Sequence, residues 1–222
     1  MNLISSDHGL GTTRVHVPKR KINLADNYSA DLKASHQIIR NALSDKNISG
    51  LVLLHGKPGT GKSTYLNFLL SQLDKEVFLL SPRILNSLDH PEMINTLLRM
   101  EDSILVVEDA EELIESRDKN RSSAIAWLLN LTDGLLGDAL KMKVICTFNT
   151  SLKNIDEALL RKGRLIARHE FRELNIEQSK NLLRKIGIEN PIVNSPMTLA
   201  DIYQYRQNNF QIEQKQIGFK VS

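Results

Sequence analysis

Residues 56–63 have the types and the spacing that would hold a triphosphate. They read Gly-Lys-Pro-Gly-Thr-Gly-Lys-Ser, which fits the phosphate-binding pattern of Gly, four residues, Gly, Lys and then Ser or Thr. The glycines let backbone N–H groups curl close to phosphate oxygens, and a following helix would add free N–H groups and its positive dipole end. In this pattern Lys62 would reach the β- and γ-phosphates of ATP, and the Ser63 hydroxyl would ligate Mg²⁺.

The segments on either side suit such a loop. Residues 50–55 read as a short buried strand and residues 64–73 as a helix. Strand, glycine-rich loop and helix are the setting that the pattern needs. A glycine-rich turn that binds nothing is the alternative, and these segments argue against it. We therefore predict an ATP-binding set of nine residues: Gly56, Lys57, Pro58, Gly59, Thr60, Gly61, Lys62, Ser63 and Thr64.

A pair of carboxylates, Glu108 and Asp109, follows the aliphatic run 104–107. One carboxylate could hold Mg²⁺, usually through water, while the other activates the attacking water. If Glu108 takes the metal position, Asp109 is the base. If Asp109 takes the metal position, Ala110 stands where the base should be, and hydrolysis would be crippled. The count of four aliphatic residues favours the first register.

Two further acidic residues, Glu111 and Glu112, fit the start of a helix, where the helix dipole favours negative charge. Asn149 follows another apolar run, residues 144–148. An amide there could donate to the γ-phosphate and position water, and a turn-forming Asn is the alternative. Residues 155–165 read as a helix end with basic residues and a glycine stop, which by itself requires no function for its arginines.

Near-continuous aliphatic runs alternate with helical patterns along the chain. The runs read as buried strands at residues 50–55, 77–80, 104–107 and 144–148. The intervening patterns predict helices at residues 28–43, 64–73, 91–98 and 123–131, with Gly134 and Gly137 marking the end of the last one. This alternation predicts a parallel sheet covered on both faces, with ligands beyond the carboxyl ends of its strands. The glycine loop, Glu108, Asp109 and Asn149 would then converge on one edge.

The two ends of the chain differ from this middle part. Residues 1–21 are predicted to be irregular, since glycines and a proline break any periodicity. Towards the other end, Asn175 can cap a helix with Gln178 as its partner, and Gly187 would stop it. Ser195, followed by proline, reads as the start of a second helix. We predict an N-terminal arm over 1–21, a nucleotide-binding α/β domain over 22–172, and a small helical lid and tail over 173–222.

Composition excludes several classes of protein. The chain has 222 residues, 41% of them hydrophobic, and no apolar run reaches the ~18 residues of a membrane span. A single cysteine, Cys146, cannot form an intramolecular disulfide, which fits a reducing, cytoplasmic location. The formal net charge of +3 is too small to favour nucleic acid as a partner. The basic run at residues 19–21 could touch phosphate or an acidic partner, although a solvated arm is the simpler interpretation.

The ordered set of motifs resembles the AAA family of ATPases, over roughly residues 22–205. Residues 56–63 resemble its Walker A motif, and Asn149 matches its sensor 1. Glu108 and Asp109 resemble its Walker B motif, although the usual order is Asp and then Glu. The resemblance implies a P-loop NTPase fold: a three-layer αβα parallel sheet with a small C-terminal helical lid.

The resemblance also implies a set of site residues that composition does not require. Residues 158–164 resemble the second region of homology, in which two arginines reach the neighbouring subunit's nucleotide; here they are Arg161 and Arg164. Residues 128–134 resemble the helix before the sensor strand. Two features depart from the family. Lys57 replaces a common proline, and residues 81–88 contain no aromatic-hydrophobic-Gly loop, which puts substrate threading in doubt.

The function implied by the resemblance is Mg²⁺-dependent ATP hydrolysis by a homo-oligomeric ring, expected to be a hexamer, that remodels an unknown protein partner. A first alternative is an assembly factor that binds ATP and oligomerises but barely turns over, and the order of the acidic pair separates the two. A second alternative is a loader-type ATPase linked to nucleic acid. The modest net charge stands against it.

Overall fold

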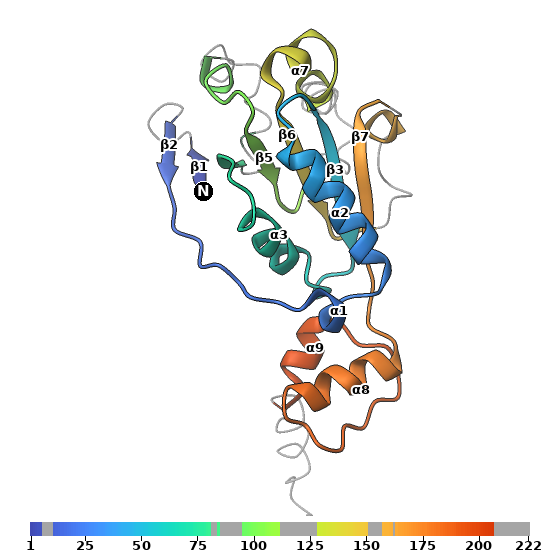
Figure 1. Ribbon diagram of the computed structural model, residues 1–222. Coiled ribbons are helices and arrows are strands. Elements are labelled where there is room, and N and C mark those ends of the chain that lie inside the picture. Colours follow the sequence, from blue (N-terminus) through green and yellow to red (C-terminus); the bar gives the residue numbers. More distant parts are fainter. Residues whose placement is uncertain are drawn as a thin grey trace, which may run out of the picture.

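The strands of the chain form one mixed, mostly parallel sheet (Figure 1). A computed structural model describes residues 1–5, 11–80, 84, 95–111, 128–150, 157–161 and 163–206. Within those ranges the strand order is β2-β1-β4-β5-β6-β3-β7. The strands are β1 (Asn2–Ser5), β2 (Gly11–Arg14), β3 (Gly50–Gly56), β4 (Val77–Leu80), β5 (Ile104–Val107), β6 (Lys143–Phe148) and β7 (Leu165–Phe171). Every neighbouring pair is parallel except β1 with β2.

Helices cover this sheet because successive strand residues point to opposite faces. Along β3, Val52 and Leu54 pack with α2 and α3 on one face, while Leu51 and Leu53 pack with residues 128–132 and α7 on the other. The helices are α1 (Leu24–Asn27), α2 (Asp31–Ser44), α3 (Lys62–Leu70), α7 (Gly134–Leu140), α8 (Ile176–Lys185) and α9 (Leu199–Tyr203), with a 3₁₀ turn η3 (Glu157–Leu160). The predicted α/β architecture is confirmed.

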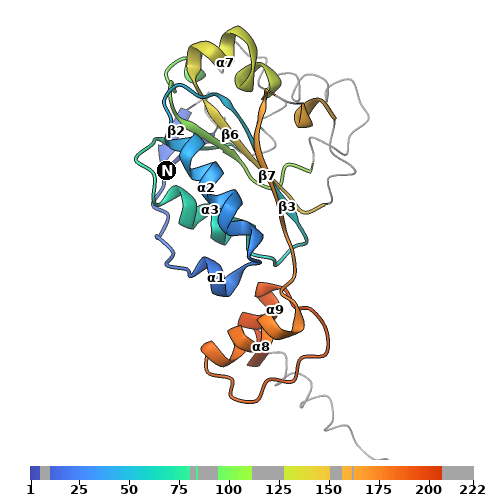
Figure 2. The ribbon, with the colours of Figure 1, turned by 45° about the vertical axis from the view of Figure 1, so that its right-hand side comes forward.

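The last two helices form a small unit beyond one end of the sheet, as both views show (Figures 1 and 2). The predicted capping box of Asn175 and Gln178 is present at the start of α8, and Gly187 adopts φ +88° just after its end. The predicted start of the next helix at Ser195 is wrong. Thr198 caps α9 instead, because its hydroxyl accepts from the Asp201 N–H while the Asp201 carboxylate closes a second capping box.

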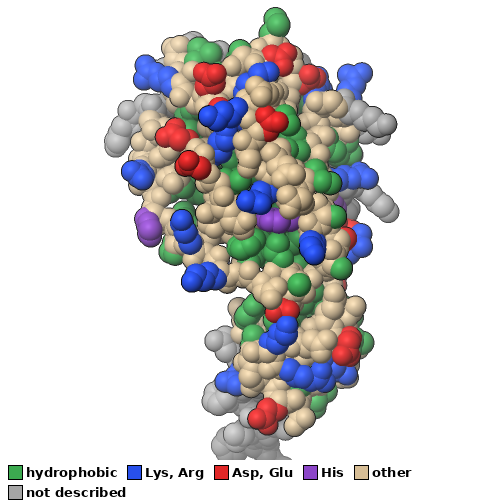
Figure 3. Space-filling model, viewed as in Figure 1, with side chains coloured by type: hydrophobic (Ala, Val, Ile, Leu, Met, Phe, Trp, Pro, Cys, Tyr) green, Lys and Arg blue, Asp and Glu red, His purple; other side chains and the backbone are tan. Residues whose placement is uncertain are grey.

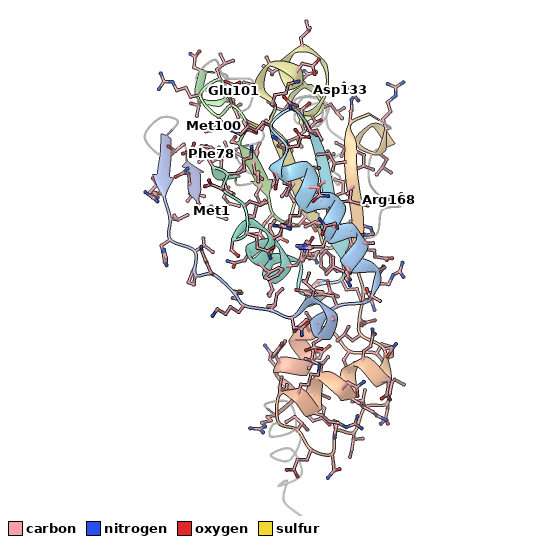
Figure 4. The ribbon with its side chains drawn as sticks, viewed as in Figure 1. Met1, Phe78, Met100, Glu101, Asp133 and Arg168 are labelled. Carbon is pink, nitrogen blue, oxygen red and sulfur yellow. The ribbon has the colours of Figure 1, made fainter. Side chains whose placement is uncertain are left out.

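The expectation of an irregular segment over residues 1–21 is wrong for both of its strands. β1 pairs in parallel with β4, with Asn2 opposite Phe78, and β2 pairs antiparallel with β1 (Figure 4). The free edge of β4 supplies backbone partners, and Ile4 is 1% exposed in the core. An apolar stretch of two residues, Leu3 and Ile4, is too short to show a strand period. Residues 15–23, which we name the strap, then pass α3, where the Arg20 N–H donates to Asn67 Oδ1 at 3.1 Å.

The helical residues 128–132 end just before Asp133 and Gly134, as expected, and Gly134 then begins α7, where the Asp133 side chain accepts from its N–H. The expectation for Gly137 is wrong, because Gly137 lies inside α7. β7 was not predicted, because its mixed residues Leu165–Phe171 hide any simple alternation, although it pairs with β3 along its length. The positions predicted to be helical at 91–94 and 123–127, and the tail from 207, lie outside the described residues. Residues 95–97 and 128–132 are helical.

The three-part division of the chain into domains stays a prediction. Within the described ranges, no helix is both long and apolar enough to cross a membrane.

A buried charge cluster lies at the amino ends of the strands. Lys143 opens β6 with a fully buried side chain, and its ammonium donates to Asp102 Oδ1 at 2.7 Å. Lys75 donates to the other oxygen of the same carboxylate. Burial alone would raise the pKa of Asp102, but the two lysine hydrogen bonds and charges outweigh it and hold that pKa below its usual value. Asp102 therefore neutralises a charge that water cannot reach.

Asp102→Asn should lower the free energy of unfolding by about 3 kcal/mol, because it leaves a buried ammonium group without its counterion. Urea denaturation measures the change. The difference from wild type should begin to shrink as the pH falls below the ordinary Asp pKa of about 4, where the unfolded chain takes up the proton, and it should disappear only below the lowered pKa of the folded state, where Asp102 itself loses its charge. The double variant Asp102→Asn/Lys143→Met should recover much of the loss. An unchanged stability of Asp102→Asn would contradict the role given to this pair.

Candidate functional site

The glycine loop after β3 takes a backbone path that other residues would resist. Gly61 has φ +93°, in the left-handed region, and a Cβ there would lie 2.6 Å from Leu199 Cδ1. At Gly56, with φ +145°, a Cβ would lie 2.1 Å from the carbonyl oxygen of Phe171. The chain therefore needs glycine at both positions to turn tightly out of β3 and into α3.

The ammonium group of Lys62 sits inside this loop. It donates to the carbonyl oxygens of Gly56 at 2.7 Å and Lys57 at 3.0 Å, and the residue is 6% exposed. Burial lowers the pKa of Lys62, while the nearby charges of Asp109 and Glu111 act in the opposite direction. A desolvated ammonium held by neutral carbonyls, with an open cavity beside it, is suited to pair with an anion.

A cavity of about 710 Å³ opens beside the loop. Its lining comes from four parts of the chain: the loop and α3, the carboxyl ends of β5 and β6, the strap with α1, and the lid. The residues are Pro58, Gly59, Gly61, Lys62, Ser63 and Thr64, then Asp109 and Asn149, then Arg20, Lys21, Ile22 and Asn27, and finally Leu199, Ala200, Tyr203 and Gln204. The structure thus brings together the three motifs that the sequence placed at one edge.

Three residues of the predicted binding set do not line the cavity. Gly56 makes the turn, and the Thr60 hydroxyl donates to the Lys57 carbonyl at 2.7 Å, which ties the loop internally. The Lys57 side chain is 69% exposed and its ammonium pairs with Glu173 at 3.0 Å, on the connection that leads to the lid. Lys57 therefore holds the loop to that connection.

Asp109 and Asn149 form a connected polar pair at the cavity. The Asn149 side-chain amide donates to Asp109 Oδ1 at 2.9 Å. The Asp109 backbone, at φ +51°, donates its N–H to the Thr147 hydroxyl at 2.9 Å. Asp109 is thus held on β6 by its own backbone and side chain, with its carboxylate lining the cavity.

Glu111 belongs to the same cluster, although its place in the sequence had indicated only a helix start. Its carboxylate accepts a hydrogen bond from the Asn149 backbone N–H, and its charge raises the pKa of Lys62. The signal that could have found it is its position two residues after Asp109. Glu112 lies outside the described residues.

Ser63 and Glu108 are chemically suited to a magnesium ion, although Glu108 is not among the residues that line the cavity. Oε1 of Glu108 is buried and has no hydrogen-bond partner, an arrangement that costs free energy unless something is bound there. Ser63 lines the cavity at the start of α3. Mg²⁺ usually keeps several waters and takes only one or two protein ligands beside phosphate oxygens. The described residues include no group of three His, Cys, Asp or Glu side chains that could hold a metal ion.

The structure does not bring Arg161 and Arg164 to this cavity. Nε of Arg164 pairs with Asp133 Oδ2 at 2.6 Å, at the start of α7. The Arg164 carbonyl accepts from the Leu51 N–H at 2.8 Å, so the residue lies beside the beginning of β3. The glycine loop begins five residues further on, roughly 16 Å away at the rise of a β-strand. Arg161 is exposed.

Comparisons with known proteins agree with this geometry. A model of the ATPase family associated with various cellular activities (AAA) matches residues 52–173. An AAA-ATPase of Arabidopsis thaliana is 32% identical over 124 residues, which are 51% of this chain and 27% of that protein. The mitochondrial chaperone BCS1 of Bos taurus is 28% identical over 51% of this chain and 29% of its own length. The matches cover less than a third of each of these relatives.

Lys62→Ala should weaken ATP binding by about 10- to 100-fold, the scale of one lost hydrogen bond from a charged group. Isothermal titration calorimetry measures it. Lys57→Ala is the matched control, because it removes an ammonium from the same loop but outside the cavity, and it should bind ATP almost as the wild type does. Equal losses in the two variants, or none in Lys62→Ala, would refute the assignment of this loop.

Proposed function

We propose that this chain, which belongs to the AAA family of ATPases, binds Mg-ATP in the cavity beside the glycine loop and hydrolyses it as part of a ring that remodels a protein partner. The observation that carries the proposal is the convergence of Lys62, Asp109 and Asn149 on one cavity from three separate strand ends. A phosphate cradle, a base and a water-positioning amide are the parts that phosphoryl transfer needs.

Each residue of the site has a defined task in this proposal. Lys62 exchanges its loop carbonyls for phosphate oxygens, and the loop N–H groups surround the same oxygens. Ser63 and Glu108 would hold Mg²⁺, which would neutralise part of the phosphate charge when bound. Asp109 accepts the proton of the attacking water. Asn149 orients that water with its side-chain amide, which also donates a hydrogen bond to Asp109.

One observation keeps the assembly-factor alternative open. An Asp at the base position has a carboxylate one methylene closer to its backbone than the usual Glu. The Asp109 carboxylate is also engaged by Asn149, and its backbone is in the left-handed region. A carboxylate with less reach would leave nucleotide binding intact while slowing turnover. Measured turnover therefore separates an ATPase motor from an assembly factor.

The acidic pair yields a test of the two registers. Asp109→Asn should still bind Mg-ATP but hydrolyse it at least about a hundredfold more slowly, the scale of general-base catalysis. Glu108→Gln should instead raise the Mg²⁺ concentration needed for half-maximal activity. Steady-state phosphate release at varied Mg²⁺ measures both. A wild-type protein without turnover in any oligomeric state would overturn the hydrolysis proposal in favour of the assembly factor.

The position of the arginines supports a shared site between subunits. Arg161 and Arg164 lie outside the cavity, and Arg164 lies beside the amino end of β3. A guanidinium at that end could reach the nucleotide of a neighbouring subunit. A group in that position stabilises the charge of the transferring phosphoryl group and raises the rate of hydrolysis by ~10³ or more. The proposal of a ring, expected to be a hexamer, rests on this placement and on the common behaviour of the family. The chaperone named among the relatives favours a protein partner.

Arg161→Ala and Arg164→Ala should each abolish most hydrolysis while leaving ATP binding by the isolated chain nearly intact. Chains with Lys62→Ala cannot use ATP but still offer arginines, and chains with Arg164→Ala bind ATP but lack one. Mixing the two should restore part of the phosphate release if the arginine acts across an interface.

The control mixture pairs Arg164→Ala with the double variant Lys62→Ala/Arg164→Ala, which offers no Arg164, and it should stay inactive. Absence of recovery in the first mixture, with co-assembly shown by light scattering, would mean that Arg164 acts within its own chain or only through Asp133.

A cytoplasmic location remains a prediction of the sequence.

A further inference from the structure

A second cavity, of about 720 Å³, lies between the strap, the end of α3 and the starts of β1 and β4. It shares no lining residue with the cavity beside the glycine loop. Its volume falls in the range of small-molecule sites, roughly 300–1,000 Å³. Part of its wall is apolar, from Val15, Leu70 and Val77, so it could enclose more than a solvated ion.

Most of the charged side chains that line this cavity are basic. Arg14, His16 and Lys19 reach it from β2 and the strap, and Figure 3 shows Lys, Arg and His side chains following one another along the strap. None of these three pairs with an acidic side chain in the part of the chain that the structure describes. Glu76 is the acidic residue of the described lining.

Lys75 adds a positive charge that is built into the fold. Its side chain is 8% exposed, and it lines the cavity while donating to Asp102. Asp102 also binds the fully buried Lys143, so one carboxylate faces two ammonium groups. The cluster contains one more positive than negative charge, and Lys75 brings a positive charge to the wall of the cavity.

A polar residue also lines the cavity from α3. Oδ1 of Asn67 accepts from the Arg20 backbone N–H, which ties α3 to the strap beside the cavity. A phosphate group accepts several hydrogen bonds at once and pairs well with guanidinium and ammonium groups from different directions.

We propose that this second cavity binds a small organic molecule that carries phosphate groups, with its anionic end on Arg14, Lys19 and Lys75 and its apolar body on Val15, Leu70 and Val77. The proposal is independent of ATP hydrolysis, because the two cavities have no lining residue in common. It also assigns the basic residues of the strap to a phosphate ligand, the alternative that the sequence leaves open beside a solvated arm.

Inorganic pyrophosphate is the probe, titrated calorimetrically into the full chain at about 0.15 M salt after the glycine loop is saturated with a non-hydrolysable ATP analogue. One further site per chain is expected. The double variant Arg14→Ser/Lys19→Ser should lose at least about tenfold in affinity for pyrophosphate, because two charged donors are removed. Its affinity for the ATP analogue should be unchanged, which also shows that the variant is folded.

The matched control is Arg40→Ser/Lys46→Ser, which removes the same charge from exposed positions on α2 and the turn after it. It should bind pyrophosphate almost as the wild type does. Equal losses in the two double variants would show a diffuse attraction to a basic protein and overturn the proposal. The absence of a pyrophosphate site beside the occupied glycine loop would overturn it as well. Loss of the ATP-analogue site itself would bear on the proposed function and not on this cavity.

Discussion

The parallel pairing of β3 with β6, and of β6 with β5, is the constraint on which the site depends. In that register Leu53 lies opposite Cys146, which lies opposite Val107, so the three strands end within three residues of one another at the same edge of the sheet. Backbone hydrogen bonds fix this register over whole strands, and a slip of one residue would turn every side chain to the other face. The glycine loop, Asp109 and Asn149 therefore lie close together at the carboxyl ends of these strands.

The glycine loop is held from outside as well as from within. The carbonyl of Gly59 accepts from the Ala200 N–H at 3.0 Å, and the carbonyl of Gly61 accepts from the Tyr28 hydroxyl at 3.0 Å. The lid and the segment after the strap are therefore each hydrogen-bonded to the loop that would bind phosphate. A movement of this loop on nucleotide binding would shift or break both hydrogen bonds. In the proposed function, this is the physical link between the nucleotide and the rest of the molecule.

The two ends of the sheet carry complementary halves of the proposed shared site. The nucleotide cavity lies at the carboxyl ends of the strands, and Arg164 lies with Asp133 beside the amino end of β3. The bond from Arg164 holds the pKa of Asp133 below its usual value, so the carboxylate stays charged and keeps the guanidinium in place. The strands of the sheet separate these two parts by the length of a strand, which is the physical basis of the proposal that Arg164 acts on a neighbour's nucleotide.

The features that depend on local chemistry can be predicted from the sequence alone. The glycine loop, the four aliphatic strands and the cap at Asn175 each follow from residue types over a few positions, because backbone freedom, apolar runs and capping oxygens act locally. The remaining features depend on contacts that form only in the folded chain. β1 is a strand because the edge of β4 offers it hydrogen bonds, and Glu111 joins the site because the Asn149 N–H faces it. Such contacts join residues far apart in the chain, so no local pattern records them.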